Sequence, residues 1–458
     1  MKNLDSNIKT MEASIYKYNN IYVIFLAFIS ALGGYLFGFD FAVISGALPF
    51  LKLQFALTSL GEGFLTGSLA LGCIAGCLFA GKIADQYGRR PGLIAAAAIF
   101  AVSSLSMAFS GTLLVFIGMR FCAGIGVGMA SMLSPLYIAE ISPANVRGRN
   151  VAINQLTIVI GILITNLVNY HLADKGPESW RWMFGMGFIP SVLFLIGVIL
   201  LPESPRWQLK NKLTTKAETT LTKIGGAKYA IDIIADMNKA PKQQTMASYK
   251  SVLSKSVRPA VLIGVVLAVF QQLCGINVVF NYTSVIFKSA GASLDRQLFE
   301  TVVIGIVNML FTLLAMWQVD KLGRRPLMLI GSLGLSIIYL VLAFLLGHNG
   351  GTWLISIFVM LAIAIYATSL APVTWVIISE IFPNHIRGVA SSVAIVALWG
   401  AYFILVFTFP ILSEHMGTFG PFYLYSAICL VGFFFIKVKV KETKGQTLEQ
   451  LESTFTIH

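Results

Sequence analysis

Twelve apolar stretches, each about as long as a lipid bilayer is thick, constrain this chain more than any other feature. A membrane-spanning helix needs about 20 predominantly apolar residues. Runs of this kind lie at 22–50, 61–84, 92–112, 113–141, 150–171, 182–201, 258–287, 298–319, 327–347, 353–380, 389–412 and 420–437. Within lipid every backbone polar group must be paired inside the protein, and a helix pairs them within one segment. The sequence therefore predicts an all-α integral membrane protein with twelve transmembrane helices.

The composition and the placement of charge agree with this prediction. Charged residues make up 12% of the chain, against roughly 25% in soluble domains. The net charge of +13 is better explained by topology than by nucleic-acid binding, because the basic residues gather on one side if both termini are cytoplasmic. No aromatic residues for base stacking are interleaved with the basic runs. We expect a multi-pass protein of the inner or plasma membrane, with cytoplasmic termini and no nucleic-acid partner.

The reactive residues argue against an enzyme or a metalloprotein. All five cysteines fall within predicted spans, and neither a histidine nor a carboxylate joins Cys73 and Cys77 to form a metal site. The sequence contains no recognisable nucleophile–base pair. We therefore expect no catalytic residue, no metal and no cofactor.

Two motifs occur twice, which indicates an internal repeat. Asp-x-x-Gly-Arg-Arg-Pro lies at 85–91 and again at 320–326, and Glu-Ile-x-Pro-x-x-x-Arg-Gly lies at 140–148 and again at 380–388. Parallel repeats build transporters whose substrate site lies near the midplane between the halves. The predicted domains are an N-terminal six-helix bundle (1–202), an intracellular helical linker (203–257), a C-terminal six-helix bundle (258–440) and a cytoplasmic tail (441–458).

The segment between the two bundles is polar and basic. It holds nine lysines and one arginine and includes short helix-like pieces. It is either a flexible linker or a small helical bundle that clamps the two halves from the cytoplasmic side. We favour the helical bundle.

The duplicated motifs also bring many charges to one side of the membrane. Their arginines either pair with carboxylates at neighbouring helix ends or serve only as topology markers. Because both motifs recur together, we favour a charge latch that closes the cytoplasmic side and breaks when the halves rock. The residues of this predicted latch are Asp85, Arg89, Arg90, Glu140, Arg147, Glu203, Arg206, Asp320, Arg324, Arg325, Glu380 and Arg387.

One carboxylate, Asp40, lies inside the first apolar run, where an ionisable group is expensive and by default marks an ion or substrate pathway. Arg120, near the start of the fourth run, is its obvious partner. The first span runs outward and the fourth runs inward, so both residues fall in the outer half of the membrane. We predict that they meet and that Asp40 binds a proton.

The seventh span carries an unusual number of amides. Gln271, Asn281 and Tyr282 lie near one stripe of this helix, Gln272 borders the stripe, and Asn277 lies somewhat further round. Such side chains serve either as interhelical glue or as a site for a neutral polyol, because amides both donate and accept hydrogen bonds. We favour the polyol site. Further polar or aromatic side chains at plausible depth come from Gln155, Asn308 and Trp375.

From about residue 22 to 449, the chain resembles the sugar porter family of the major facilitator superfamily. The residues that carry the resemblance are Gly-x-x-x-Gly-x-x-Asp40, both Asp-x-x-Gly-Arg-Arg loops, Arg120 before Gly-Ile-Gly-Val-Gly, Pro-Glu203-Ser-Pro-Arg206-Trp, Gln271-Gln272-x-x-Gly-Ile-Asn277, Glu380-Ile-Phe-Pro-x-x-x-Arg387-Gly and Glu442-Thr-Lys-Gly. Among its members, the chain looks most similar to bacterial xylose– and glucose–proton symporters.

The resemblance implies roles for matched positions. Gln155, Gln271, Gln272, Asn277 and Trp375 correspond to sugar-contacting residues. Phe37 and Tyr282 match aromatic neighbours of the sugar, and Asp40 matches the carboxylate of proton-coupled members. Asn281 replaces the first Tyr of a usual pair, Leu398 replaces a sugar-contacting amide, and Ile162, Ala371, Gly187 and Lys441 are further departures.

Together these features predict a proton-coupled symporter for a glucose- or xylose-like monosaccharide, working by alternating access and functional as a monomer in the lipid bilayer. One alternative is a facilitative uniporter of the same fold, in which Asp40 is only structural. The other is a membrane sugar sensor, which the short tails disfavour.

Overall fold

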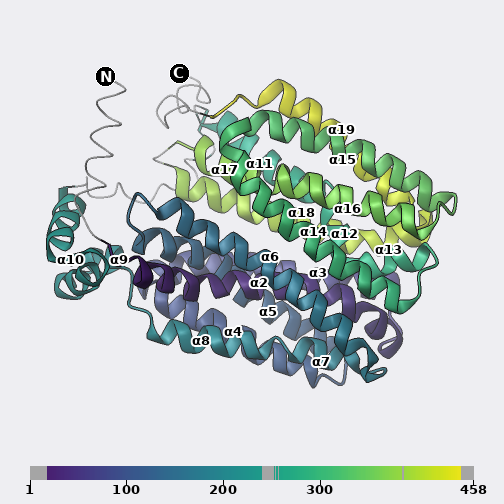
Figure 1. Ribbon diagram of the computed structural model, residues 1–458, viewed down its shortest axis with the longest axis horizontal. Helices are drawn as coiled ribbons and strands as arrows, with labels where there is room; N and C mark the ends of the chain where they lie inside the picture. Colours follow the sequence, from purple (N-terminus) through teal and green to yellow (C-terminus); the bar gives the residue numbers. More distant parts are fainter. Residues whose placement is uncertain (1–17, 240–251, 253, 256, 384–385, 445–458) are drawn as a thin grey trace.

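The computed structural model describes residues 18–239, 252, 254–255, 257–383 and 386–444 (Figure 1). This described part consists of helices and their connections and contains no strand. Twelve helical segments in it are long and apolar enough to cross a membrane. The predicted all-α class with twelve membrane helices is confirmed, and the chain is a multi-pass membrane protein.

The first six spans form one side of the molecule in Figure 1, coloured purple to teal. They are α2 (Asn20–Gln54), α3 (Ser59–Gln86), α4 (Arg89–Ala108), α5 (Leu113–Ile141), α6 (Arg147–Leu172) with the 3₁₀ turn η1 (Ala173–Lys175), and the pair α7 (Ser179–Gly185) and α8 (Phe188–Leu200). Threonine side chains accept hydrogen bonds from the first-turn N–H groups of α3 and α5 (Thr58 and Thr112), as N-cap residues do.

The last six spans form the other side, coloured green to yellow in Figure 1. They are α11 (Arg258–Leu273) with α12 (Ile276–Asn281) and α13 (Thr283–Ser289), then α14 (Leu294–Leu322), α15 (Arg324–Gly347), α16 (Thr352–Thr368) with α17 (Leu370–Ile381), α18 (Arg387–Met416) and α19 (Gly420–Lys439). The domain boundaries predicted at 202, 257 and 440 fall outside these helices.

Three spans that the sequence predicted as continuous helices are interrupted. The sixth is divided into α7 and α8 at residues 186–187, and the seventh is divided both before α12 and between α12 and α13. The seventh breaks at Gly275, which has the left-handed φ of 91° that favours glycine. A side chain there would also meet the ring of Tyr425. The tenth breaks at Ser369, between α16 and α17. The sequence analysis missed these breaks because the apolar runs continue through them.

The linker forms α9 (Pro205–Lys210) and α10 (Thr214–Lys239). Both helices contact the N-terminal half. Trp207 Nε1 on α9 donates to the Asp85 carbonyl over 3.1 Å, and the Ile224 carbonyl on α10 accepts from Asn19 N over 2.8 Å. Helical structure in the linker agrees with the interpretation that we favoured. A clamp on both halves stays a prediction, because residues 240–251 lie outside the described part.

The molecule has two distinct ends. We call the end that carries α9 and α10 the linker end and the opposite one, with α7 and α13, the far end (Figure 1). Hydrogen bonds join the two halves in the far part: Ser284 Oγ donates to the Ser45 carbonyl over 2.8 Å, and Asn166 Nδ2 donates to the Thr301 carbonyl over 2.7 Å. The halves are therefore closed against each other at the far end.

Candidate functional site

Asp40 and Arg120 meet in the interior of the N-terminal half. Asp40 lies in the second half of α2 and Arg120 in the first part of α5, and both side chains are 0% exposed. Arg120 Nη1 donates to Asp40 Oδ1 over 3.2 Å. The guanidinium also lies over the ring of Phe184, 5.7 Å from its centroid. The structure thus brings together the two side chains that the sequence paired by depth.

This ion pair leaves some of its polar atoms without a hydrogen bond. Within the described part, Asp40 Oδ2 and Arg120 Nε and Nη2 have no hydrogen-bond partner. A buried ion pair recovers its desolvation cost only with further hydrogen bonds, and loss of one partner leaves an uncompensated buried charge. The pair is therefore an arrangement whose energy changes strongly when Asp40 takes up a proton.

The amides of the seventh span form a hydrogen-bonded chain in the C-terminal half. Gln271 Nε2 donates to the Ala371 carbonyl on α17 over 3.4 Å, and Gln272 Nε2 donates to Gln271 Oε1 over 3.1 Å. Asn277 then donates to Gln272 Oε1, across the break at Gly275. We call Gln271, Gln272, Asn277 and Asn281 the amide chain.

Asn281 continues this chain toward α18. Its Nδ2 donates to the Asn277 carbonyl over 2.6 Å, and its Oδ1 accepts a hydrogen bond from the Tyr402 hydroxyl over 3.2 Å. Tyr282 is placed differently: its hydroxyl donates to the Val406 carbonyl over 2.7 Å, and its ring packs on Phe409. Tyr282 is thus held by α18 and is not hydrogen-bonded to the amide chain.

The remaining residues that were predicted to contact sugar are more exposed than the amide chain. Phe37 on α2 is half-buried with its ring 5.7 Å from that of Trp399 on α18. Gln155 on α6 is exposed, and Trp375 on α17 is 44% exposed. Trp375 lies one helical turn beyond Ala371, the residue that accepts from Gln271. The described contacts do not join Gln155 or Trp375 to the amide chain by a hydrogen bond.

In the N-terminal half, several of the predicted latch residues have charged or hydrogen-bonded partners at the linker end. Arg89 Nε and Nη2 each donate over 2.8 Å to the two oxygens of Glu140, a bidentate pair between α4 and α5. The Glu203 carboxylate accepts from the backbone N–H of Arg89 and Arg90 at the start of α4. Burial raises the pKa of Glu203, and the backbone N–H groups oppose this rise. Asp85 pairs with Lys210 on α9 over 3.3 Å.

The C-terminal half repeats this arrangement. Glu442 accepts from the backbone N–H of Arg324 and Arg325 at the start of α15, over 3.0 Å in each case. These backbone N–H groups and that of Lys444 hold the pKa of Glu442 below its usual value, against the opposing effect of burial. Both carboxylates lie against a glycine with positive φ, Gly88 or Gly323.

Not every predicted latch residue has such a partner. Arg387 Nε donates to the Phe382 carbonyl over 3.2 Å, Arg206 is exposed, and Arg147 Nε has no hydrogen-bond partner in the described part. The side chains of Asp320 and Glu380 lie outside the described residues. The sequence analysis did not assign Glu442 to the latch, although it follows the second repeat as Glu203 follows the first. The two described ion pairs of the latch lie between α4 and α5 (Arg89–Glu140) and between α3 and the linker helix α9 (Asp85–Lys210).

Burial distinguishes the ion pairs at the linker end. The Arg89 and Glu140 side chains are 11% and 7% exposed. Arg89→Ala leaves Glu140 without its charged partner and is expected to cost about 3–5 kcal/mol of stability. Lys210→Ala breaks the exposed pair with Asp85 and should cost about 0–1 kcal/mol. Thermal unfolding of both detergent-solubilised variants measures the contrast, and equal melting temperatures would show that the Arg89–Glu140 pair contributes no more than a surface pair.

Comparison with known proteins places the chain in a family. The model of the "Sugar (and other) transporter" family matches residues 26–455. The chain is 39% identical to the putative metabolite transport protein YwtG of Bacillus subtilis, over 94% of each protein. It is 37% identical to the D-xylose-proton symporter of Escherichia coli, over 95% of this chain and 96% of that protein.

A solved structure resembles the whole fold. The partially occluded inward open conformation of the xylose transporter XylE from E. coli matches with a TM-score of 0.84 and 34% identity, over 93% of this chain and 100% of that chain. Sequence motifs, family model, relatives and fold agree. The chain therefore belongs to the sugar porter family of the major facilitator superfamily, as its motifs predicted.

Proposed function

We propose that this protein is a proton-coupled symporter for a neutral, glucose- or xylose-like monosaccharide, working by alternating access. The observation that supports this most directly is the fully buried Asp40–Arg120 pair in the same molecule as the amide chain. One site has the chemistry to bind a proton and the other the chemistry to bind hydroxyl groups. A relative at 37% identity is a D-xylose-proton symporter.

Asp40 has the properties required of a proton site. Its carboxylate is buried, it faces one cation, and one of its oxygens has no hydrogen-bond partner in the described part. Protonation converts the ion pair into a neutral acid beside a cation, so the two states differ in how tightly α2 is held to α5. In our proposal the ionised pair maintains one conformation of the N-terminal half, and protonation permits the other once sugar is bound.

The amide chain has the properties required of a sugar site. Amide groups donate and accept without net charge, which matches the hydroxyl groups of a neutral sugar. The break at Gly275 separates α11 from α12, and transporters commonly build substrate sites from discontinuous helices. In our proposal Gln155 and Phe37 contribute from the N-terminal half, and Trp375 offers an aromatic face to the sugar.

The distribution of contacts supports alternating access. The halves are joined by hydrogen bonds at the far end, and the described ion pairs at the linker end lie within the N-terminal half or between it and the linker. The similar XylE structure is an inward open conformation. We infer that the structure represents the inward-open state and that the latch residues keep the linker ends of the two halves rigid while they rock.

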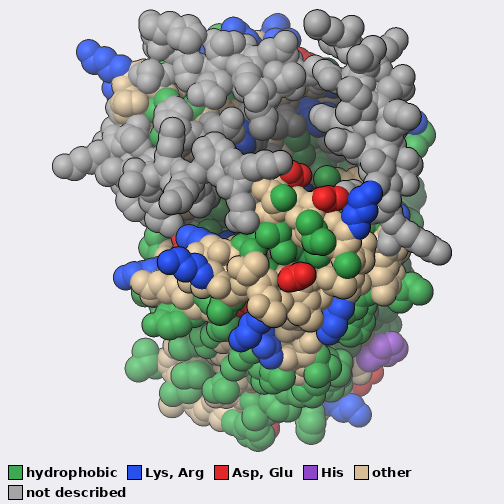
Figure 2. Space-filling view, turned by 90° about the vertical axis from the view of Figure 1, so that its left-hand side faces the viewer, with side chains coloured by type: hydrophobic (Ala, Val, Ile, Leu, Met, Phe, Trp, Pro, Cys, Tyr) green, Lys and Arg blue, Asp and Glu red, His purple; other side chains and the backbone are tan. Residues whose placement is uncertain are grey.

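The charge distribution supports an orientation. Basic side chains gather at the linker end (Figure 2), as they do on the cytoplasmic side of membrane proteins. We therefore propose that the linker end faces the cytoplasm, that both termini lie there, and that the protein resides in the cell membrane and functions as a monomer. Members of this family are transporters, and we propose no enzymatic activity.

Asp40→Asn tests the proton site. Asparagine keeps the shape of aspartate but cannot ionise, so we expect loss of sugar accumulation driven by a proton gradient, with counterflow exchange of labelled sugar at least partly retained. Uptake of labelled xylose and glucose into proteoliposomes, with and without a proton gradient, measures both activities. Continued accumulation against a sugar gradient by Asp40→Asn would exclude Asp40 as the coupling site.

Gln272→Ala tests the sugar site. Removal of one amide leaves sugar hydroxyls without a partner at a cost of about 1–3 kcal/mol, or roughly 5- to 150-fold in affinity. Gln297→Ala is the matched control, because the Gln297 side chain is as buried but donates to the Ala292 carbonyl, outside the amide chain. Calorimetry in detergent with xylose and glucose measures binding. If Gln272→Ala binds both sugars as tightly as the control, the amide chain only joins helices.

A further inference from the structure

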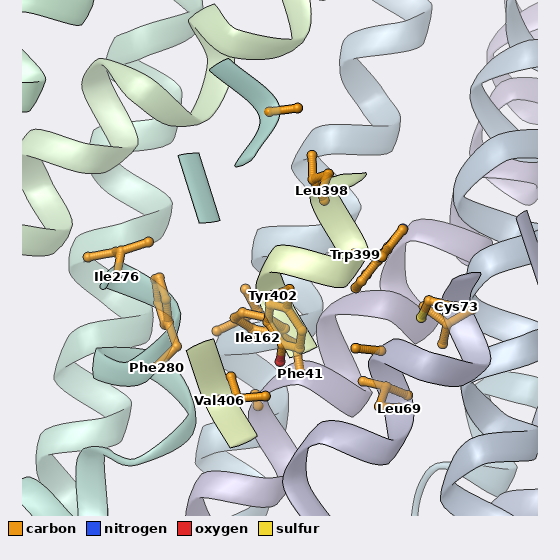
Figure 3. Close-up of a cluster of buried hydrophobic side chains, with 14 of the residues drawn as sticks. Phe41, Leu69, Cys73, Ile162, Ile276, Phe280, Leu398, Trp399, Tyr402 and Val406 are labelled. Atoms are coloured by element: carbon orange, nitrogen blue, oxygen red, sulfur yellow. The ribbon is translucent and has the colours of Figure 1, made fainter. Parts of the chain in front are cut away.

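Tyr402 on α18 lies between the two sites just described. Its side chain is 1% exposed, and its ring packs 5.7 Å from that of Phe41 and 5.6 Å from that of Trp399 (Figure 3). Phe41 directly follows Asp40 on α2, so this aromatic contact joins the C-terminal half to the helix that carries the proton site. The sequence analysis did not single out Tyr402.

The Tyr402 side chain contacts the amide chain through its hydroxyl and the helix that carries Asp40 through its ring. It donates to Asn281 Oδ1 over 3.2 Å, and Asn281 in turn donates to the Asn277 carbonyl over 2.6 Å. Electrostatic interactions also connect this hydroxyl with Arg120 and Asp40. Tyr402 thus touches the end of the amide chain and packs on Phe41, the residue that follows Asp40 on α2.

Arg120 needs a second acceptor when Asp40 becomes neutral. In the structure its Nη1 donates to Asp40, while its Nε and Nη2 have no hydrogen-bond partner in the described part. A buried guanidinium remains charged after Asp40 is protonated, and a buried charge requires compensating hydrogen bonds. A tyrosine hydroxyl that already donates one hydrogen bond retains lone pairs with which to accept another.

We propose that Tyr402 is a positioning residue that accepts a hydrogen bond from Arg120 when Asp40 is protonated, and so connects the proton site to the amide chain. The proton stays on Asp40, Arg120 keeps its charge, and the Tyr402 hydroxyl continues to donate to Asn281. Because Arg120 belongs to the N-terminal half and Tyr402 to the C-terminal half, the new contact crosses the interface that must move. This inference rests on the proposed symport.

The neighbours of Asp40 leave few alternatives for this link. Its interacting titratable or charged groups are Arg120 on α5, Cys73 on α3 and Tyr402 on α18. Cys73 is fully buried on α3, within the N-terminal half. It is a weak hydrogen-bonding group and cannot transmit a change across the interface. Of these three groups, only Tyr402 comes from the C-terminal half.

Tyr402→Phe removes the hydroxyl and keeps the ring. We measure the dissociation constants of xylose and glucose at acidic and at alkaline pH, together with proton-driven accumulation in proteoliposomes. In the wild type, coupling between the sites should change the affinity with pH by roughly 5- to 150-fold. In Tyr402→Phe we expect this ratio to shrink by roughly tenfold or to vanish, the equivalent of one hydrogen bond to a charged group, with counterflow exchange retained.

Two further variants separate coupling from packing. Tyr339→Phe is the matched control: Tyr339 on α15 is fully buried in the same half, and its hydroxyl has no hydrogen-bond partner in the described part. It should keep the pH dependence of the wild type. Tyr402→Gln restores an acceptor and should recover part of the dependence that Tyr402→Phe loses.

An unchanged pH dependence in Tyr402→Phe would overturn the inference, and so would an equal loss in Tyr339→Phe. If Tyr402→Phe does not fold, a Tyr402→Gln variant without any pH dependence overturns it. A wild type that neither accumulates sugar with a proton gradient nor changes affinity with pH would instead refute the proposed symport, and the inference would fall with it.

Discussion

The ion pair between Asp40 and Arg120 is the interaction on which the rest of this structure depends. It places two charges in the fully buried interior of the N-terminal half, and it leaves three of their polar atoms without a hydrogen bond in the described part. Such a pair is a poor stabiliser, because apolar residues of similar volume would often serve as well. In our proposal its value lies in having two states, ionised and protonated, that differ in how they hold α2, α5 and the adjoining half.

A second constraint comes from the backbone of the C-terminal half. The breaks at Gly275 and Ser369 interrupt two spans at the height where the amide chain lies. Unwound backbone is tolerated within a membrane only where protein or a water-filled site covers it. The broken helices and the amide chain therefore belong together. The proposed proton and sugar sites lie in different halves of a molecule that is closed at the far end.

The sequence alone predicted the membrane spans and the family. It also predicted that Asp40 meets Arg120, because run length and chain direction determine the depth of a residue in a membrane. It missed the helix breaks, since Gly275 looks like any packing glycine until Tyr425 is seen beside it. It also left Glu442 out of the latch and overlooked Tyr402. Their partners lie more than 100 residues away along the chain, and no local pattern reports such contacts.

Proton movement that accompanies sugar entry tests the central claim most directly. Wild-type protein is reconstituted in vesicles that contain a pH-sensitive dye, without an initial pH gradient, and xylose or glucose is added outside. If the buried carboxylate couples the two fluxes, sugar entry will acidify the vesicle interior in step with uptake. Sugar entry at an undiminished rate with no change of internal pH would show a uniporter and contradict this account.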